Sequence, residues 1–381
     1  MPVELTILMP CLNEAETLAG CIRNAHLGAQ EAGVEEYEVL VADNGSTDGS
    51  PGIADAEGAR VIHVPRRGYG AALQAGIEQA RGRYVIMGDS DESYDFRQIG
   101  AFVQRLRTGD QLVMGTRLKG EIRPGAMPLL HRYLGNPVLT FLGNLLFRTG
   151  LSDFHCGLRG FDREAVTALG LRTTGMEFAS EMVIRATLSG LKTSEIPIVY
   201  TPDRRSRRPH LRTWQDGWRH LRFMLLFSPR WVFIYPGVTL AVVSGLAVGI
   251  LLRGPLRVGS VVFDVSSLLV ASSLLIVGVQ MVLFGVFARA YAARMGLLPV
   301  QAGLERFIDS FSLGAGLASG VGLSLLGVGV YAAGLLTWSR QGFGPLDYEQ
   351  ILRIMIPGML LLVGGLQVFF SSFMLSLLGF R

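Results

Sequence analysis

The sequence predicts an α/β domain with a mostly parallel, Rossmann-like sheet and helices on both faces, followed by an α-helical membrane domain. Two observations support this prediction. In the first part of the chain, short apolar runs typical of strands alternate with segments of helical periodicity, as in parallel α/β folds. Beyond Trp231 the chain becomes apolar with brief polar breaks. The average composition, 49% hydrophobic over 381 residues, hides this division.

Five short runs in the first part have the length and composition of strands. They are residues 5–9, 37–42, 60–64, 84–87 and 112–115. The segments with helical periodicity between them are residues 16–32, 71–80 and 99–106. Because ligands of such sheets bind at the carboxyl ends of the strands, we expect a functional site at that edge.

Four uncharged stretches in the second part are long enough to cross a membrane as helices. They are residues 231–252, 265–288, 310–338 and 354–380. A helix crosses the hydrocarbon core with roughly 20 apolar residues, whereas shorter runs of about 10–14 are more typical of buried core helices. We therefore predict a transmembrane domain with four helices over residues 230–381.

The start of the chain and its loop charges bear on orientation. The chain enters a strand directly after Met1–Glu4, without a basic segment before an apolar core, so we expect the N-terminal domain on the cytoplasmic face. Arginines between the second and third spans agree with that side, and they are Arg289, Arg294 and Arg306. The bias is weak, because the loops expected outside carry Arg253, Arg257 and Arg340.

The cysteines and the charge exclude some classes of function. Cys11, Cys21 and Cys156 lack the paired spacing of a zinc site or a disulfide framework, so we expect reduced, structural thiols. The net charge of +4 is modest, and much of it lies in an arginine-rich stretch near residues 204–222. This distribution favours anionic lipid or phosphate over nucleic acid as a partner.

Polar clusters follow three of the predicted strands. They are residues 10–14, 43–48 and 89–91. One residue separates Asp89 from Asp91, so in a turn both carboxylates can point into one pocket. Two hard oxygen ligands with open positions suit Mg²⁺ or Mn²⁺ held jointly with substrate phosphates, and the ion would neutralise a diphosphate leaving group. Solvated acidic loops share this spacing, but the two other clusters favour the metal site.

The remaining polar positions suggest a nucleotide ligand. Asp43 ends its strand, where a carboxylate can accept hydrogen bonds from a base or ribose, and Asp48 has mainly a structural role in the turn that follows. Residues 10–14 join a strand to a helix N-terminus, which favours polar or anionic ligands. Arg67 precedes a glycine that lets backbone approach a phosphate. Leu73 stands where a dinucleotide fingerprint requires glycine, which argues against a Rossmann dehydrogenase.

Together these residues resemble the motifs of family-2 inverting glycosyltransferases with a GT-A domain, over roughly residues 4–229. In chain order the motifs are Pro10-x-x-Asn13-Glu14, Asp43-Asn44-Gly45-Ser46-x-Asp48, Asp89-x-Asp91, Gly115-Thr116-Arg117 and Asp153-x-x-Cys156-Gly157-Leu158-Arg159-Gly160-Phe161. Each motif is weak alone, but their order and spacing together are specific. The last two motifs and the membrane tail resemble the polyprenyl-phosphate branch, which includes dolichyl-phosphate mannose and glucose synthases.

The resemblance implies metal-dependent transfer of a hexose, with inversion, from a nucleotide sugar such as GDP-mannose or UDP-glucose to dolichyl or undecaprenyl phosphate. It implies that the nucleotide sugar binds Pro10, Asn13, Glu14 and Asp43, and Arg67 is a further candidate from its position before a glycine. The reaction centre would include Asp89, Asp91 and Asp153, with the metal on Asp89 and Asp91. Arg117 and Arg159 would hold the acceptor phosphate. Two positions depart from the family pattern, Ser93 in place of a frequent Gln and Asn44 in place of a second Asp.

The segment before the membrane domain is expected to meet the lipid. Arg204 and Arg205 are further candidates for the acceptor phosphate, because arginine binds phosphate through two hydrogen bonds. Residues 213–229 have an apolar face opposite arginines and are expected to form an interfacial amphipathic helix. Residues 1–212 would then form the GT-A domain. Residues 134–146 fit either a second interfacial helix or a core helix.

Two other functions remain open. A processive polysaccharide synthase would share the domain, but its usual Gln-x-x-Arg-Trp motif is broken here, because Phe227 precedes Arg230 and Trp231. A non-enzymatic flippase or assembly protein for lipid-linked sugars would use the four helices, but the intact acidic motifs argue against it. The number of helices also suggests a homo-oligomer.

A phosphate acceptor has a second pKa of about 6, so it needs no protein base near neutral pH.

Overall fold

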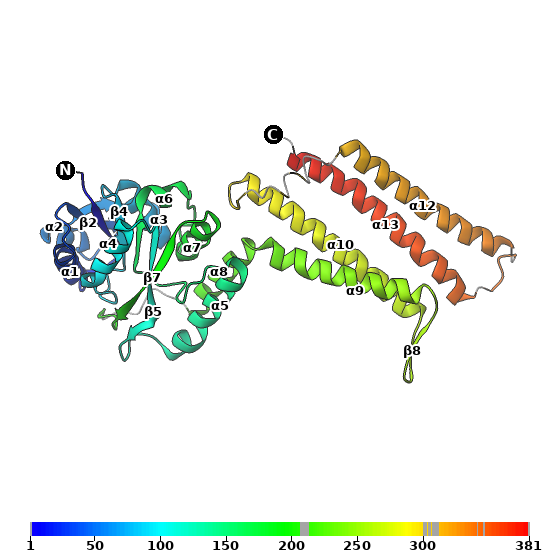
Figure 1. Ribbon diagram of the computed structural model, residues 1–381, viewed down its shortest axis with the longest axis horizontal. Helices are drawn as coiled ribbons and strands as arrows, with labels where there is room; N and C mark the ends of the chain where they lie inside the picture. Colours follow the sequence, from blue (N-terminus) through cyan, green and yellow to red (C-terminus); the bar gives the residue numbers. More distant parts are fainter. Residues whose placement is uncertain are drawn as a thin grey trace. The chain divides into compact units, whose positions relative to one another are not determined.

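The computed structural model describes residues 2–205, 213–299, 303, 306, 312–340, 342–345 and 347–379. The chain divides into two compact units, Met1–Leu226 and Phe227–Arg381 (Figure 1). Part of the predicted basic stretch, residues 206–212, lies outside the described residues, as do the first two residues of the predicted span 310–338 and the last residue of the span 354–380.

The first unit is built on a seven-stranded sheet with the order β3-β2-β1-β4-β6-β5-β7. The strands are β1 Leu5–Cys11, β2 Tyr37–Asp43, β3 Arg60–His63, β4 Tyr84–Met87, β5 Leu112–Ile122, β6 Arg159–Asp162 and β7 Thr193–Tyr200. β6 is antiparallel to both of its neighbours, and the other pairings are parallel. The predicted α/β domain with a mostly parallel sheet is therefore confirmed.

Helices cover both faces of this sheet (Figure 1). The helices of the first unit are α1 Leu18–Glu31, α2 Ser50–Ala56, α3 Tyr69–Gln79, η1 Phe96–Ile99, α4 Gly100–Arg107, η2 His131–Gly135, α5 Asn136–Phe147, α6 Arg163–Ala168, α7 Phe178–Leu188 and α8 Thr213–Leu226. Alternate residues of a strand point to opposite faces. Ile7 of β1 belongs to the same buried cluster as Ile22 of α1 and Phe102 of α4. Leu8 points to the other face, where Gly76 of α3 packs directly on its side chain.

The five predicted strands are present, but β6 and β7 were not predicted. β6 is only four residues long and begins and ends with a charged residue, so it lacks an apolar run. β7 contains Pro197, which removes a backbone donor. β7 tolerates this proline because it lies at the edge of the sheet. Both strands depend on pairing with β5, a contact that local sequence pattern does not report.

In the described part of the second unit, four helices are long and apolar enough to cross a membrane, as predicted. They are η3 with α9 at Arg230–Leu251, α10 Val265–Arg294, α12 Leu313–Arg340 and α13 Tyr348–Gly379. η3 covers Arg230–Ile234 and α9 covers Tyr235–Leu251. A short hairpin of β8 Leu256–Val258 and β9 Val261–Phe263, which was not predicted, joins α9 to α10.

Glycines allow α9 and α10 to pack closely. A Cβ atom added at Gly278 of α10 would lie 2.6 Å from the backbone nitrogen of Ala241. One added at Gly237 of α9 would lie 2.9 Å from the Cβ of Met281. Small residues at such contacts are how membrane helices bring their backbones together, since lipid supplies no hydrophobic drive between helices.

We expect Gly278→Ala to lower the midpoint of thermal unfolding of the full-length protein in detergent. The added methyl group overpacks the seam, which typically costs about 1–3 kcal/mol. Gly249→Ala in α9 is the matched control, because a Cβ there meets nothing within 4 Å. Alanine at that exposed position is expected to be neutral or to stabilise the helix by about 0.5–1 kcal/mol. Equal midpoints for the two variants would contradict close packing at the seam.

Candidate functional site

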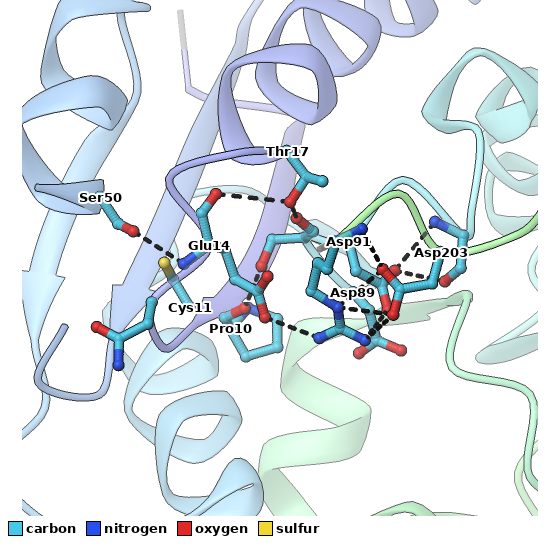
Figure 2. A network of polar contacts seen from close by, with 12 residues as sticks. Pro10, Cys11, Glu14, Thr17, Ser50, Asp89, Asp91 and Asp203 are labelled. Atoms are coloured by element: carbon cyan, nitrogen blue, oxygen red, sulfur yellow. Dashed lines mark hydrogen bonds and ion pairs between the residues drawn. The ribbon is translucent and has the colours of Figure 1, made fainter. Parts of the chain in front are cut away.

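The three predicted polar clusters meet at one edge of the sheet. β1 pairs in parallel with both β2 and β4, so their carboxyl ends lie side by side. The backbone nitrogen of Asn13 donates to Ser46 Oγ at 2.8 Å, which joins the first two loops. Ser90 Oγ donates to the carbonyl of Pro10 at 2.8 Å, which joins the first to the third. The structure thus assembles a single site from segments far apart in sequence (Figure 2).

Asp43 organises the turn after β2. Its carboxylate accepts hydrogen bonds from the backbone nitrogens of Ser46 at 3.0 Å and Gly45 at 3.2 Å, and it lies 3.2 Å from His63 Nδ1. Burial raises the pKa of Asp43, but the bonds with Ser46 and then His63 outweigh it and lower the pKa overall. The carboxylate is therefore ionised and held in place at the sheet edge.

The turn is also tied to the loop after β1. Asn13 has a left-handed backbone, with φ of 58°, and its Oδ1 accepts from the backbone nitrogen of Thr47 at 2.7 Å. Asp48 accepts from the backbone nitrogen of Ala15 at 2.9 Å. Asn13 and Asp48 thus hold one loop against the other, and Asp48 has the structural contacts expected of it.

Asn44 connects the same turn to the segment before α3. Its amide nitrogen donates to the carbonyls of Arg66 at 2.8 Å and Val64 at 3.2 Å, and its Oδ1 accepts from the backbone nitrogen of Gly68 at 2.7 Å. An aspartate could not donate the first two bonds, which gives a physical reason for the departure at this position. Arg67 is exposed and donates to the carbonyl of Asn44 at 2.6 Å, so it lies over the turn.

A hollow of about 350 Å³ opens beside these loops. Its walls are formed by Asn13, Glu14, Glu16, Thr47, Asp48 and Arg205. Arg205 Nη1 lies 2.9 Å from Glu14 Oε1, its Nη2 lies 3.0 Å from Asp91 Oδ2, and the guanidinium also pairs with Asp203. Figure 2 shows the carboxylates of Glu14, Asp89, Asp91 and Asp203 near one another. The structure thus places Arg205 among the residues expected to bind the donor.

Asp89 and Asp91 follow β4, as the sequence predicted. Asp91 Oδ1 accepts from the backbone nitrogen of Ser93 at 3.0 Å and from its hydroxyl, and Asp89 Oδ1 accepts from the Tyr69 hydroxyl at 2.9 Å. Burial and then the neighbouring Asp91 carboxylate raise the pKa of Asp89 to about 7. A Cβ at Gly157 would lie 3.0 Å from Asp89 Oδ2, so the loop before β6 closes against this carboxylate.

The two carboxylates fit a divalent cation that is shared with a ligand. They repel each other in a buried setting, and a hard cation takes carboxylate oxygens. Within the described residues, no group of three or more His, Cys, Asp or Glu side chains could hold a metal by itself. The remaining ligands would therefore come from bound phosphate or water, which is common for Mg²⁺ sites.

Arg117 and Asp153 form a buried pair, and the charge of Arg117 acts on Asp89. Arg117 Nε and Nη2 lie 2.7 and 2.9 Å from the two oxygens of Asp153, and the side chains are 9% and 1% exposed. Burial raises the pKa of Asp153, but Arg117 outweighs it and lowers the pKa. Asp153 is therefore ionised and paired with Arg117. The Arg117 guanidinium also lies 5.3 Å from the centre of the Tyr200 ring.

The two other arginines expected at the acceptor differ in their surroundings. Arg159 is fully buried, and its guanidinium donates to the carbonyls of Cys156 at 2.8 Å and Ala179 at 2.6 Å. It satisfies backbone acceptors inside the domain. Arg204 has a side chain that is 78% exposed, with its Nε 3.4 Å from Glu92 Oε2. Arg204 is thus exposed, whereas Arg159 is enclosed by backbone carbonyls.

Sequence reasoning did not find every residue of the site. Tyr69 and Tyr200 carry no motif of their own, and Tyr200 ends a strand that was not predicted. Ser93 was noted only as a departure, and its two bonds to Asp91 show that it orients that carboxylate. Asp95 pairs with exposed Arg97 and caps η1.

Comparison with known proteins gives the family. Residues 6–170 match glycosyl transferase family 2, and residues 286–379 match the family 2 C-terminal transmembrane region. The chain is 38% identical over 380 residues to the low-salt glycan biosynthesis hexosyltransferase Agl6 of Haloferax volcanii, covering 98% of this chain and 89% of that protein. It is 30% identical over 200 residues to the dolichyl-phosphate hexose transferase of the same organism, covering 52% of this chain and 82% of that protein.

A similar solved structure is glucosyl-3-phosphoglycerate synthase from Mycobacterium tuberculosis, in complex with Mn²⁺, UDP and phosphoglyceric acid. The two chains are 24% identical, and the match covers 59% of this chain and 76% of the synthase chain. The TM-score is 0.46. The full-length match and the two family regions agree with the seven-stranded sheet and the four apolar helices. The chain therefore belongs to glycosyl transferase family 2 and is a membrane-associated hexosyltransferase with a GT-A domain, related to dolichyl-phosphate hexose transferase.

Proposed function

We propose that this protein transfers a hexose from a nucleotide sugar to the phosphate of a polyprenyl lipid, with inversion at the anomeric carbon and with Mg²⁺ or Mn²⁺. The observation that carries the proposal is the position of Arg117. The positive charge of this buried arginine opposes the rise in the pKa of Asp89, and its partner Asp153 precedes Phe154, which contacts α5 and its exposed apolar residues. Arg117 would thus offer positive charge to the acceptor phosphate between the acidic cluster and the exposed apolar residues of α5.

The donor would occupy the hollow beside the first two loops. Asn13, Glu14 and Asp43, with the backbone at Pro10, would contact the base and ribose. Arg67 lies over the same turn and would meet a phosphate there. We assign Arg205 to the donor diphosphate rather than to the acceptor, because its guanidinium lies between Glu14 and Asp91.

Asp89 and Asp91 would hold the metal ion together with the donor diphosphate. A bound divalent ion supplies positive charge that stabilises the leaving diphosphate. Ser93 and Tyr69 keep the two carboxylates in their present orientations through hydrogen bonds. Arg205 adds charge at the same place, which favours departure of an anionic leaving group.

The acceptor phosphate needs no proton acceptor from the protein. A phosphate monoester has a second pKa of about 6 and is already ionised near neutral pH. Its oxygen would form a bond to the anomeric carbon while the bond to the nucleoside diphosphate breaks, and the leaving group keeps the electron pair. Arg117 and exposed Arg204 would hold this phosphate. Asp153 keeps Arg117 oriented, and Arg159 holds the surrounding loop through backbone carbonyls.

The lipid would be reached through two apolar helices of the first unit. α5 exposes Phe141 (64% accessible), and α8 exposes Trp214 and Trp218, at 79% and 61%. The segment before α5 exposes Leu129, at 74%. α5 and α8 contact each other, so their apolar residues share one part of the domain. Soluble domains rarely expose such patches without a partner, and tryptophan favours the membrane interface. We place this surface on the cytoplasmic leaflet, in agreement with Arg294 at the end of α10 and Arg306 between α10 and α12.

We expect Trp214→Ser combined with Trp218→Ser to raise the KM for polyprenyl phosphate in vesicles by about tenfold, because losing about 1.4 kcal/mol of apolar burial corresponds to that factor. The KM for the nucleotide sugar should stay unchanged. Leu27→Ser on α1 is the control, since Leu27 is also exposed, at 46%, and lies on another helix. A similar rise in the control would mean that the effect is not specific to α8.

A donor screen tests the proposed function. The full-length protein in vesicles would receive polyprenyl phosphate, Mn²⁺ and each of GDP-mannose, UDP-glucose and UDP-N-acetylglucosamine, and the lipid would be analysed by mass spectrometry. We expect a lipid-phosphate hexose from one donor, and nucleotide release that depends on the lipid. A product of many sugar units would favour a processive synthase. Lipid-independent binding without any product would favour a flippase or assembly protein.

A further inference from the structure

Three polar side chains form a continuous chain of contacts in the interior of the first unit. His155 comes from the loop before β6, Ser180 from the first turn of α7 and His220 from α8. Ser180 Oγ lies 3.1 Å from His155 Nε2 and 2.8 Å from His220 Nδ1. The two imidazole rings are 4.5 Å apart and meet edge to face. These contacts join α8 to the loop that carries Asp153.

These groups are shielded from water. Ser180 is fully buried and His220 is 7% exposed. Burial, and then nearby His220, hold the pKa of His155 well below its usual range, so this ring is neutral. A buried polar chain is costly where its bonds are incomplete, and apolar side chains would fill the same space without that penalty. The two bonds of Ser180 are directional and restrict where His155 and His220 can lie, while His155 Nδ1 has no hydrogen-bond partner among the described residues.

His220 lies on the face of α8 that points away from the exposed tryptophan. Trp218 is 61% exposed, whereas His220 and, one turn later, Met224 are buried at 7% and 0%. One face of α8 is thus exposed and can contact lipid, while the other contacts Ser180 and His155, which together with His220 we call the relay. A shift of α8 on the membrane would move His220 and so change its contacts with Ser180 and His155.

The loop at the other end of the relay leads to the acceptor side of the site. The backbone nitrogen of His155 bonds the carboxylate of Asp153, which in turn pairs with Arg117. The neighbouring residue Phe154 is held by α5, because its backbone nitrogen donates to Thr140 Oγ1 at 3.2 Å. A Cβ at Gly143 of α5 would lie 2.6 Å from the Phe154 ring. Both apolar helices are therefore attached to consecutive residues of one loop.

We propose that His155, Ser180 and His220 are positioning residues. Through them, binding of α8 to the membrane would set the orientation of Asp153 and Arg117. This inference rests on the proposed function in one respect, the role of Arg117 at the acceptor phosphate. Hydrogen bonds are directional, so a few such bonds restrict the loop more tightly than packing alone. The acceptor arginine would thus reach its working orientation when the domain lies on lipid.

Hydrogen exchange of the full-length protein tests the relay without any substrate. The peptide covering residues 151–158 would be compared in detergent micelles and in nanodiscs of phosphatidylcholine and phosphatidylglycerol. We expect exchange in the wild-type protein to be slower in nanodiscs by about tenfold, equivalent to one directional hydrogen bond of about 1.4 kcal/mol. His220→Leu should remove this difference. His220→Asn should keep it, because an amide can place a hydrogen-bonding atom near the position of Nδ1.

Ser180→Ala gives a second variant with almost the same volume, in case leucine at position 220 prevents folding. It should also remove the nanodisc effect. In turnover on polyprenyl phosphate, both His220→Leu and Ser180→Ala should lower kcat by about tenfold and leave the KM for the nucleotide sugar unchanged. A purely structural role would change both parameters and would not be rescued by His220→Asn.

The proposed role of the relay is wrong if the hydrogen-exchange rate of residues 151–158 in the wild-type protein is equal in micelles and nanodiscs. It is also wrong if Ser180→Ala keeps the wild-type difference between the two environments. Failure of the proposed function gives a different result. In that case the wild-type protein makes no lipid-phosphate hexose from any donor, while the exchange comparison still reports whether α8 and the loop are coupled.

Discussion

Asp91→Asn is expected to lower the rate of hexose transfer by about three orders of magnitude. The change removes one negative charge from the pair that would hold the divalent ion, and that ion is worth several kcal/mol to the leaving diphosphate. The fold should survive, because asparagine retains an oxygen that can accept the bonds from Ser93. The measurement is the initial rate with saturating nucleotide sugar over a range of Mn²⁺ concentrations, with circular dichroism as the check on folding.

Asp95→Asn is the matched control for this experiment. Asp95 lies four residues further along the same segment, pairs with exposed Arg97 and caps η1, a cap that asparagine also provides. Its activity should remain close to that of the wild-type protein. Near-normal activity of Asp91→Asn at saturating Mn²⁺ would show that the metal lies elsewhere.

Arg117→Ala is expected to abolish use of the lipid acceptor and to lower the free energy of unfolding by about 3–5 kcal/mol, because it leaves the buried carboxylate of Asp153 without its partner. Binding of free nucleotide should suffer less in the fraction that remains folded. Since lost stability and lost chemistry would both reduce activity, the single variant alone does not separate the two effects.

The double variant Arg117→Gln with Asp153→Asn separates them. Two neutral amides can keep a hydrogen bond at this position without leaving a buried charge unpaired. We expect the free energy of unfolding, measured by denaturant titration in detergent, to recover most of the loss. Transfer to polyprenyl phosphate should stay low, because the positive charge for the acceptor is gone. A double variant with restored transfer would show that the pair is only structural.

The sequence was sufficient to predict the architecture around the acidic cluster. Apolar runs and helical periodicity are local properties, so they located five strands of the sheet and the four membrane helices. The rule that parallel strands end at one edge then placed residues 10–14, Asp43 and Asp89 together. Their carboxylates and amides meet in the structure because β1 lies between β2 and β4. For these residues, local pattern and one topological rule were enough.

The roles of the arginines depended on tertiary structure. Arg205 and its partner Glu14 are separated by 191 residues, and Arg159 donates to a carbonyl 20 residues away. Neither contact leaves a trace in composition or periodicity, because a long charged side chain takes whichever partner the folded chain brings near it. The chain itself thus determined which groups carry charge and at which edge of the sheet they gather. Only long-range packing decided which arginines are buried, paired or exposed, since burial and pairing are properties of the assembled fold.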